Sequence, residues 1–283
     1  MSFLKFNDVT FTYPQVEGDF DSEGKQIVPQ SVFEHFSAEF PEGVFLSLVG
    51  QNGCGKTTFL MLASGRIKPV SGNVELLGKN SANLSEEQKT SLASIIYQNM
   101  EFETDEKVKN LLLSVYKNGS LKGKSSAIRD SSKDFLEEVT EVFELEEILE
   151  HSLVHISKGE IQRVILAFSL LYGSPAIFMD EPMFAMEERQ KEKSLSYLKE
   201  FVKKTGTTIY CSMHELDLTK KYADLVLLFY PNRDMSLGTP DEVLTAEDLE
   251  KAYNIPAAML KEKETLNREQ LVEIARQYGN HKI

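Results

Sequence analysis

Residues 50–58 read Gly-Gln-Asn-Gly-Cys-Gly-Lys-Thr-Thr, and this glycine-rich stretch decides the fold of the chain. A glycine, four further residues and then Gly-Lys-Thr form the phosphate-binding loop pattern. The apolar run 44–49 predicts a buried strand before the loop, and the apolar run 59–63 predicts a helix after it. Glycines in such a loop let backbone N–H groups turn towards an anion, and the helix N-terminus adds partial positive charge. The stretch therefore predicts a binding site for a nucleoside triphosphate.

The side chains of this loop have separate expected tasks. Lys56 is expected to reach the β- and γ-phosphates, and the Thr57 hydroxyl is expected to coordinate Mg²⁺. A glycine-rich turn without a ligand is the alternative, and both the spacing and the flanking segments argue against it. The predicted ATP-binding residues of the loop are Gly50, Gln51, Asn52, Gly53, Cys54, Gly55, Lys56, Thr57 and Thr58.

The composition argues against several classes of protein. The 283 residues include 44 acidic and 31 basic side chains, for a net charge of −13, which disfavours nucleic acid as the main partner. No apolar run approaches the roughly 20 residues that a membrane span requires, and residues 1–7 lack the pattern of a signal peptide. The two cysteines, one of them in the loop, predict a reducing compartment. We therefore expect a cytoplasmic protein without direct membrane insertion.

Three more apolar runs end in polar residues that suit phosphate chemistry. They are 176–179, followed by Asp180 and Glu181; 92–97, followed by Gln98; and 207–213, followed by His214. Ligands of open α/β sheets bind at the carboxyl ends of the strands, so these side chains are expected to gather around the loop. There Asp180 could hold Mg²⁺ and Glu181 could orient an attacking water.

With these motifs in this order, residues 1–240 resemble the nucleotide-binding subunits of ATP-binding-cassette (ABC) transporters. The resemblance implies that Tyr13 stacks on adenine and that Glu181 and His214 are catalytic. It also implies that Mg²⁺ is bound by Thr57, Gln98 and Asp180. The family signature, which contacts the ATP of a partner subunit, corresponds to Ser157, Lys158, Gly159 and Glu160.

Two motifs depart from the family pattern. The signature usually reads Leu-Ser-Gly-Gly-Gln, whereas residues 156–160 read Ile-Ser-Lys-Gly-Glu; the serine and the second glycine are kept. The dimer loop at 183–187, Met-Phe-Ala-Met-Glu, lacks the usual final Asp. Ser157 and Glu160 also have the spacing of a capping box, so Ser157 could simply begin a helix. Both roles are compatible, because a capped helix N-terminus can itself bind a phosphate.

The resemblance implies an α/β fold: a P-loop ABC-type ATPase core with an antiparallel β subdomain and an inserted helical subdomain. We expect the ATPase domain at 1–240, its helical subdomain at about 101–173, and a C-terminal helical extension at 241–283. Segments 3–13 and 31–49 alternate like antiparallel strands, joined by an acidic loop at 15–30. Three helices are expected from capping boxes and periodicity: one after Ser85, one after Thr245 and one at 267–277.

One helix of the inserted subdomain should bury one face and expose the other. The apolar face comprises Phe135, Val139, Val142 and Phe143, and the face expected to be mostly solvated comprises Glu137, Glu138, Glu141 and Glu144.

The function implied is that of an ATP-hydrolysing motor subunit that drives transport by separate membrane permease subunits. A second ATPase subunit, identical or homologous, would complete two composite ATP sites, and the assembly would lie peripherally on the inner face of the cell membrane. The tail at 237–255 resembles ATPases of importers for iron chelates, cobalamin and metals. The alternatives are a soluble ABC-type ATPase without a transport role, a poorly hydrolysing nucleotide-binding scaffold, or a subunit for another cargo such as an exported lipid or drug.

Overall fold

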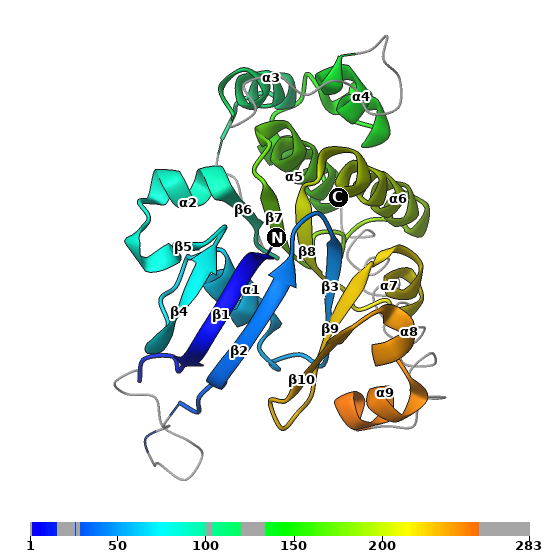
Figure 1. Cartoon of the computed structure of the whole chain (residues 1–283). Coiled ribbons are helices and arrows are strands. Elements are labelled where there is room, and N and C mark those ends of the chain that lie inside the picture. The colour runs from blue at the N-terminus through cyan, green and yellow to red at the C-terminus, as the bar shows by residue number, and fades with distance from the viewer. Residues whose placement is uncertain are drawn as a thin grey trace.

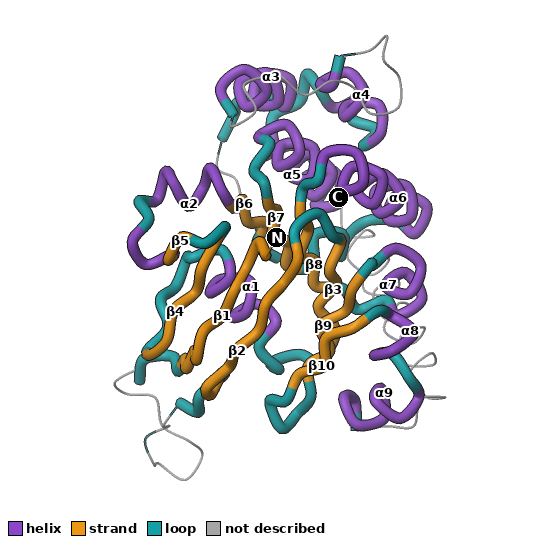
Figure 2. The backbone as a smooth tube through the Cα atoms, viewed as in Figure 1, coloured by secondary structure: helices purple, strands orange, loops and turns teal. Residues whose placement is uncertain are grey.

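The computed structural model describes residues 2–15, 26, 29–98, 100, 104–119 and 134–254, which form two β-sheets and the helices that cover them (Figures 1 and 2). One sheet is antiparallel, with strand order β2-β1-β4-β5, and the other is largely parallel, with order β10-β9-β3-β8-β7-β6. This mixed α/β architecture is the predicted fold class.

The antiparallel sheet contains the segment predicted at 3–13 and the first part of the segment predicted at 31–49. Its strands are β1 (Ser2–Phe11), β2 (Phe33–Pro41), β4 (Ser71–Leu76) and β5 (Lys79–Asn80). β1 pairs with β2 in a register that places Lys5 opposite Glu39. The expectation that all of 31–49 belongs with the antiparallel strands is wrong for its last part, because the chain turns at Gly43 and the buried strand predicted before the loop is β3 of the other sheet. In β2 only Phe33 and Phe40 are buried, whereas every residue of β3 is buried, as a parallel strand covered on both faces requires.

The second sheet supplies the strand ends that the sequence predicted. Its strands are β3 (Phe45–Val49), β6 (Ala93–Ile96), β7 (Ala176–Asp180), β8 (Thr208–Ser212), β9 (Leu225–Phe229) and β10 (Met235–Gly238). All neighbours pair in parallel except β9 and β10, which form an antiparallel hairpin. The carboxyl ends of β3, β6, β7 and β8 therefore lie along one edge.

Alternate residues of the parallel strands enter two apolar cores. Leu46, Phe178 and Tyr210 pack with the antiparallel sheet and with α1 (Lys56–Ala63), whose Phe59 is completely buried. Ile177 and Ile209 belong to the core on the other face, together with residues of α6 (Glu188–Thr205) and α7 (Leu216–Tyr222). Helix α1 thus lies between the two sheets and contacts both (Figure 1).

The helical subdomain is an excursion between β6 and β7. It contains α3 (Val108–Asn118), α4 (Phe135–Val142), α5 (Lys158–Tyr172) and the short 3₁₀ turns η2 (Glu146–Ile148) and η3 (Leu153–His155). The predicted apolar face of α4 is buried. The prediction for Glu138 is wrong: it is only 2% exposed and accepts a hydrogen bond from the Tyr197 hydroxyl at 2.7 Å. Helix α6 covers this side of α4, which sequence periodicity alone does not reveal.

Several smaller elements complete the described chain. The predicted capping box of Ser85 begins α2 (Glu86–Leu92), after the turn η1 (Ser81–Asn83). Beyond β10 lie α8 (Pro240–Val243) and α9 (Ala246–Tyr253), and Thr245 caps α9 as predicted. Most of the acidic loop at 15–30 and the helix expected at 267–277 lie outside the described residues. Among the helices that the structure describes, none has the length and apolar character of a membrane span.

Candidate active site

The predicted phosphate loop connects the end of β3 to the first residue of α1. Gly50 has φ 153°, and a Cβ placed on it would lie 2.9 Å from Cys54 Sγ and 3.0 Å from the Phe229 carbonyl oxygen. A side chain at this position would therefore push the loop away from β9. Gly55 has φ 112° and lies at the N-cap of α1, a conformation that glycine adopts without steric cost. The loop consequently leaves the N-terminus of α1 open to an anion.

Lys56 is folded back over this loop. Its side chain is buried, and Nζ donates hydrogen bonds to the carbonyl oxygens of Gly50 at 2.8 Å and Gln51 at 3.0 Å. Buried cations are stable only when their N–H groups have partners, and here two loop carbonyls provide them. These neutral acceptors can be exchanged for phosphate oxygens, which make stronger charge-assisted bonds.

A pocket of about 460 Å³ lies over the loop. It is lined by Tyr13, Val32, Asn52, Gly53, Gly55, Lys56, Thr57, Thr58, Gln98 and Glu181. Predicted site residues from the first strand region, the loop, the end of β6 and the end of β7 therefore share one cavity. Their convergence is the arrangement that a nucleotide site at the carboxyl edge of a parallel sheet requires.

Tyr13 occupies the rim of this pocket. Its hydroxyl lies 2.9 Å from Thr58 Oγ1, and the edge of its ring contacts Phe11, with centroids 5.0 Å apart. The side chain is 43% exposed, so much of the ring remains accessible. A ring anchored at one end and open to solvent can stack on a nucleobase.

Asp180 connects the loop to β8. The Thr57 hydroxyl donates to Asp180 Oδ2 at 2.6 Å, and the Ser212 hydroxyl donates to Asp180 Oδ1 at 2.7 Å. Ser212 also accepts a hydrogen bond from the backbone N–H of Glu181 at 2.8 Å. One buried hydroxyl therefore fixes both acidic residues, and the sequence analysis did not identify it. Its only sequence signal is its position two residues before His214.

Glu181 faces the pocket between two polar side chains. Gln98 Nε2 donates to Glu181 Oε2 at 2.7 Å, and His214 Nε2 lies 2.6 Å from Glu181 Oε1. Burial by itself raises the pKa of this carboxyl. The hydrogen bond and charge of His214, the charge of Lys56 and the Gln98 hydrogen bond outweigh burial, so the pKa is lowered from its ordinary 4.5. Glu181 is therefore a carboxylate at neutral pH and can accept a hydrogen bond from water.

The donors beside the loop suit Mg²⁺. Mg²⁺ prefers oxygen ligands and usually combines one or two carboxylates with substrate phosphates and water. Thr57 and Gln98 line the pocket, and the Thr57 hydroxyl is hydrogen-bonded to the Asp180 carboxylate beside it. Within the described ranges no group of three or more His, Cys, Asp or Glu side chains could hold a metal by itself. The donor set thus fits an ion that takes part of its coordination from a bound nucleotide.

The signature residues lie apart from this pocket. Ser157 caps α5 with the predicted capping box: Ser157 N donates to Glu160 Oε2 at 2.7 Å, and Glu160 N donates to Ser157 Oγ at 3.3 Å. Neither these residues nor Lys158 and Gly159 are among those that line the pocket. The structure therefore brings together Tyr13, the loop, Gln98, Glu181 and their neighbours, and it leaves the signature segment at an open helix N-terminus elsewhere on the chain.

Val32 is the other pocket residue that sequence reasoning missed. It precedes β2, and its Cγ1 would lie 3.0 Å from a Cβ added to Gly55. The side chain reaches the loop because Val32 N donates to the Phe11 carbonyl oxygen at 2.8 Å. A single valine outside a motif carries no signal in the sequence.

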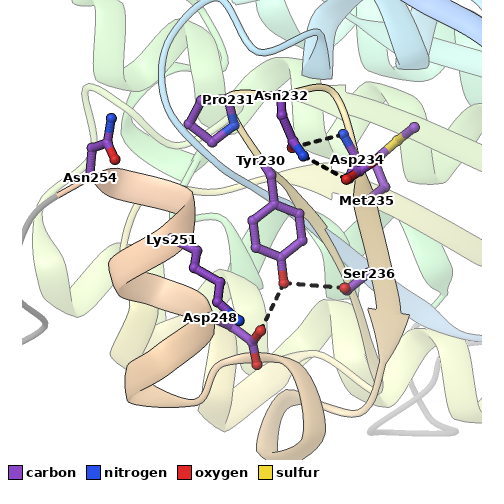
Figure 3. Close-up of a pocket in the computed structure, with 9 residues that line it drawn as sticks. All are labelled: Tyr230, Pro231, Asn232, Asp234, Met235, Ser236, Asp248, Lys251 and Asn254. Carbon is purple, nitrogen blue, oxygen red and sulfur yellow. Dashed lines mark hydrogen bonds between the residues drawn. The ribbon is translucent and has the colours of Figure 1, made fainter.

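A second pocket, of about 750 Å³, lies between the β9–β10 hairpin and α9 (Figure 3). The Tyr230 hydroxyl lies 3.2 Å from Ser236 Oγ and donates to Asp248 Oδ1 at 3.0 Å. These contacts attach α9 to the hairpin. This groove lacks the glycine loop and the helix N-terminus that distinguish the pocket over Lys56.

Comparisons with known proteins agree with this geometry. The model of the ABC transporter family matches residues 33–184, which is more than half of the chain. The manganese transport system ATP-binding protein MntB of Bacillus subtilis is 28% identical over 235 residues, 82% of this chain and 90% of MntB. The ferric enterobactin transport ATP-binding protein FepC of Escherichia coli is 24% identical over 226 residues, 80% of this chain and 82% of FepC.

The fold is also similar to that of solved cassettes. A dimeric, post-hydrolysis structure of the ATP-binding cassette MJ0796 with ADP and phosphate has a TM-score of 0.67 at 21% identity, covering 84% of this chain and 98% of the cassette. The structure of cbiO1 from Clostridium perfringens, part of the complex cbiONQ, has a TM-score of 0.65 at 19% identity, covering 88% and 92%. The chain therefore belongs to the ABC transporter family, as one of its ATP-binding, ATP-hydrolysing subunits.

Proposed function

We propose that the chain is the motor subunit of an ABC importer and that it hydrolyses ATP in a site completed by a second ATPase subunit. The observation that carries this proposal is Glu181, an ionised carboxylate held by Gln98 and His214 on the wall of the phosphate-loop pocket. It combines a phosphate-binding cradle with a group that can orient water, which is the minimum for hydrolysis at the γ-phosphate.

ATP would enter the pocket with its base on Tyr13 and its phosphates over the loop. Lys56 would exchange the carbonyls of Gly50 and Gln51 for β- and γ-phosphate oxygens. Mg²⁺, held by Thr57, Asp180 and Gln98, would supply neutralisation of the charge that develops on the phosphates.

Glu181 would then act on the water that attacks the γ-phosphorus. Its carboxylate accepts a hydrogen bond from the water, the new P–O bond forms in line, and the bond to the bridging oxygen of ADP breaks. His214 contacts Oε1 of the Glu181 carboxylate. From this position it can fix the orientation of Glu181 and reach the γ-phosphate. Gln98 also contacts Glu181, so movement of the segment after β6 would alter the catalytic carboxylate directly.

The second subunit is required because the signature segment lies outside the pocket of its own chain. The N-terminus of α5 carries open backbone N–H groups and the Ser157 hydroxyl, and α5 has 15 residues. Such a terminus is suited to a phosphate group. In a head-to-tail pair, Ser157 and Gly159 of one copy would cover the γ-phosphate bound by the other copy.

The cargo is proposed from the printed functions of relatives. They include ATP-binding proteins for petrobactin import, manganese transport and ferric enterobactin transport. We infer uptake of an iron chelate or metal, driven from the inner face of the membrane through separate permease subunits. Identification of the permease that co-purifies from gently solubilised membranes tests this part. If the co-purified permease belongs to another substrate class, the proposed cargo is wrong. If the chain is recovered without any permease, a soluble ATPase is favoured.

Glu181→Gln tests the proposed chemistry. The amide keeps the size of the side chain but is a poor acceptor for a water proton, so we expect ATP binding to persist and turnover to fall by about two orders of magnitude or more. The variant should accumulate as an ATP-bound dimer, measured by light scattering with Mg·ATP. Glu150→Gln is the control, because Glu150 pairs with Lys107 and Lys109 on the exposed surface. Wild-type turnover in Glu181→Gln would refute the assignment.

A further inference from the structure

The first turns of α5 pack against the loop Ala185–Glu187 that precedes α6. The backbone N–H of Ala185 donates to Gln162 Oε1 at 2.8 Å. A Cβ added to Gly159 would lie 2.7 Å from the Ala185 carbonyl oxygen, so the two backbones approach more closely than a side chain would allow. The position of the signature segment is therefore tied to this loop.

Arg163, one turn further along α5, joins the same helix to the end of α4. Its side chain is buried, and Nη1 donates to the carbonyl oxygens of Phe143 at 2.8 Å and Glu144 at 2.5 Å. Carbonyl groups at a helix C-terminus lack partners within the helix. Arg163 satisfies two of these groups and so links the end of α4 to the beginning of α5.

Glu144 has an unusual backbone conformation at this junction. Its φ is 53°, in the left-handed region. Glu144 N donates to the Glu141 carbonyl oxygen at 3.2 Å and Leu145 N to the Thr140 carbonyl oxygen at 3.0 Å, which are the two bonds of a Schellman motif. Glycine is the usual residue at this position of the motif. A glutamate here is unfavourable for the backbone, so the side chain should have a compensating role.

The Glu144 carboxylate binds two basic residues of α6. Arg189 donates from Nη1 at 2.8 Å and from Nη2 at 2.9 Å, in the paired geometry that makes the strongest ion pairs. Lys193 donates to the same carboxylate at 3.0 Å. The Arg189 hydrogen bonds, assisted by those of Lys193 and opposed by partial burial, lower the pKa of Glu144 to about 2. The carboxylate is therefore charged throughout the physiological range.

These contacts close a ring. The loop at 185–187 leads into α6, and Arg189 of α6 binds the Glu144 carboxylate. The Glu144 carbonyl oxygen in turn accepts a hydrogen bond from Arg163 of α5. Helix α5 contacts the loop again through the hydrogen bond between Gln162 and Ala185. Helix α4 contacts both α5 and α6, and Figure 1 shows the three helices in this region. An isolated surface ion pair would contribute little, but this pair lies where three elements meet.

We propose that Glu144 is a positioning residue for ATP hydrolysis, which sets the signature segment Ser157–Gly159 relative to the loop Ala185–Glu187. The inference rests on the proposed function, since it assumes that the signature segment contacts the ATP bound by a second subunit. Glu144 does not line the pocket of its own chain. It should therefore affect turnover in the assembled dimer and leave nucleotide binding to the loop unchanged.

Glu144→Gly separates a positioning role from a structural one. Glycine favours the left-handed backbone and keeps the carbonyl that Arg163 binds, and it removes the side chain that carries the carboxylate. We expect thermal stability close to that of the wild type, because relief of the left-handed backbone offsets the loss of the ion pair. We also expect kcat to fall about three- to tenfold, the size of coupling expected through such a network, with KM for ATP within about twofold. Glu144→Gln, measured in parallel, provides the same test without a change of backbone preference.

A mutant cycle identifies the partner of Glu144. Arg189→Ala should reproduce the loss of kcat, and Glu144→Gly/Arg189→Ala should lose no more than either single variant. Glu150→Ala is the matched control, because the Glu150 carboxylate also binds two basic side chains, but these are Lys107 and Lys109 of the helical subdomain and not residues of α6. Its kcat should equal that of the wild type. If the fold-losses of kcat of the two single variants multiply in the double variant, the proposal is overturned.

Ser157→Arg distinguishes this inference from the proposed function. If Ser157→Arg hydrolyses ATP at the wild-type rate, the composite site is wrong and the proposal for Glu144 falls with it. If Ser157→Arg is inactive while Glu144→Gly and Glu144→Gln both keep wild-type kcat, the composite site stands and the role of Glu144 alone is refuted. All variants are assayed as full-length chains with their co-purified membrane subunits.

Discussion

Ser212→Ala should damage both acidic residues of the site at once. The Ser212 hydroxyl is 1% exposed, donates to Asp180 Oδ1 at 2.7 Å and accepts from Glu181 N at 2.8 Å. A hydrogen bond to a charged group contributes about 1.5–3 kcal/mol, and an unsatisfied buried N–H costs about 1–3 kcal/mol. Because solvent does not reach this position, we expect the free energy of unfolding to fall by roughly 2–4 kcal/mol.

The fall in kcat should be larger than the fall caused by removing an equally buried hydroxyl away from the site. Glu181 has φ 47°, and the Ser212 bond helps to hold its backbone in that conformation. Without it the carboxylate should lose its alignment, and kcat should fall about 10- to 100-fold, equivalent to roughly 1.4–2.7 kcal/mol.

Ser64→Ala is the matched control for this experiment. Ser64 is also completely buried, but its hydroxyl donates to the carbonyl oxygens of Leu60 and Met61, which both lie within α1. Its loss should cost about 1 kcal/mol of stability and leave kcat near the wild-type value. Urea denaturation and steady-state ATPase assays measure both quantities. If Ser212→Ala matches Ser64→Ala in both, the reasoning about the shared hydroxyl is refuted.

Two further perturbations test separate parts of the account. Tyr13→Ala should weaken ATP binding by about 1–3 kcal/mol through loss of base stacking. Tyr13→Phe loses only the contact with Thr58, so its affinity for ATP should stay near that of the wild type. Equal ATP affinities of all three proteins, measured by calorimetry, would exclude stacking. The pKa of Glu144 is about 2 in the folded chain and 4.5 ordinarily, so its stabilising contribution is present above about pH 4.5 and lost as the pH falls towards 2. Chemical denaturation across this range should show a shallower acid slope for Glu144→Gln, and identical slopes would contradict the ion pair.

The sequence predicted the parts of the site that depend on local pattern. The bend of the loop 50–58 follows from its own glycines, and the positions of the polar residues after β6, β7 and β8 follow from where parallel strands end. Ser212 and Val32 were missed because their roles depend on neighbours distant in the chain. The burial of Glu138 likewise requires α6 to lie against α4. Hydrophobic periodicity describes one helix, and it carries no information about a second helix on the polar side.

The assignment of β2 and β3 to different sheets was missed for a related reason. Both segments are rich in apolar residues, and only the two-sided burial of β3 separates them. Gly43, with φ 72°, lies at the turn between them, but one glycine before an apolar run does not predict a change of sheet. Which sheet a strand joins is decided by pairing with β8 and β9, far along the chain.

The central claim is that each ATP is hydrolysed between the loop of one chain and the signature segment of another. The most direct measurement mixes Ser157→Arg chains with Lys56→Ala chains in the reconstituted complex and records ATPase activity. In the mixed dimer, Lys56 of the first chain and Ser157 of the second form one intact site. We predict low but measurable activity in the mixture and almost none in either variant alone. Normal hydrolysis by either variant alone, as a monomer, would contradict the account.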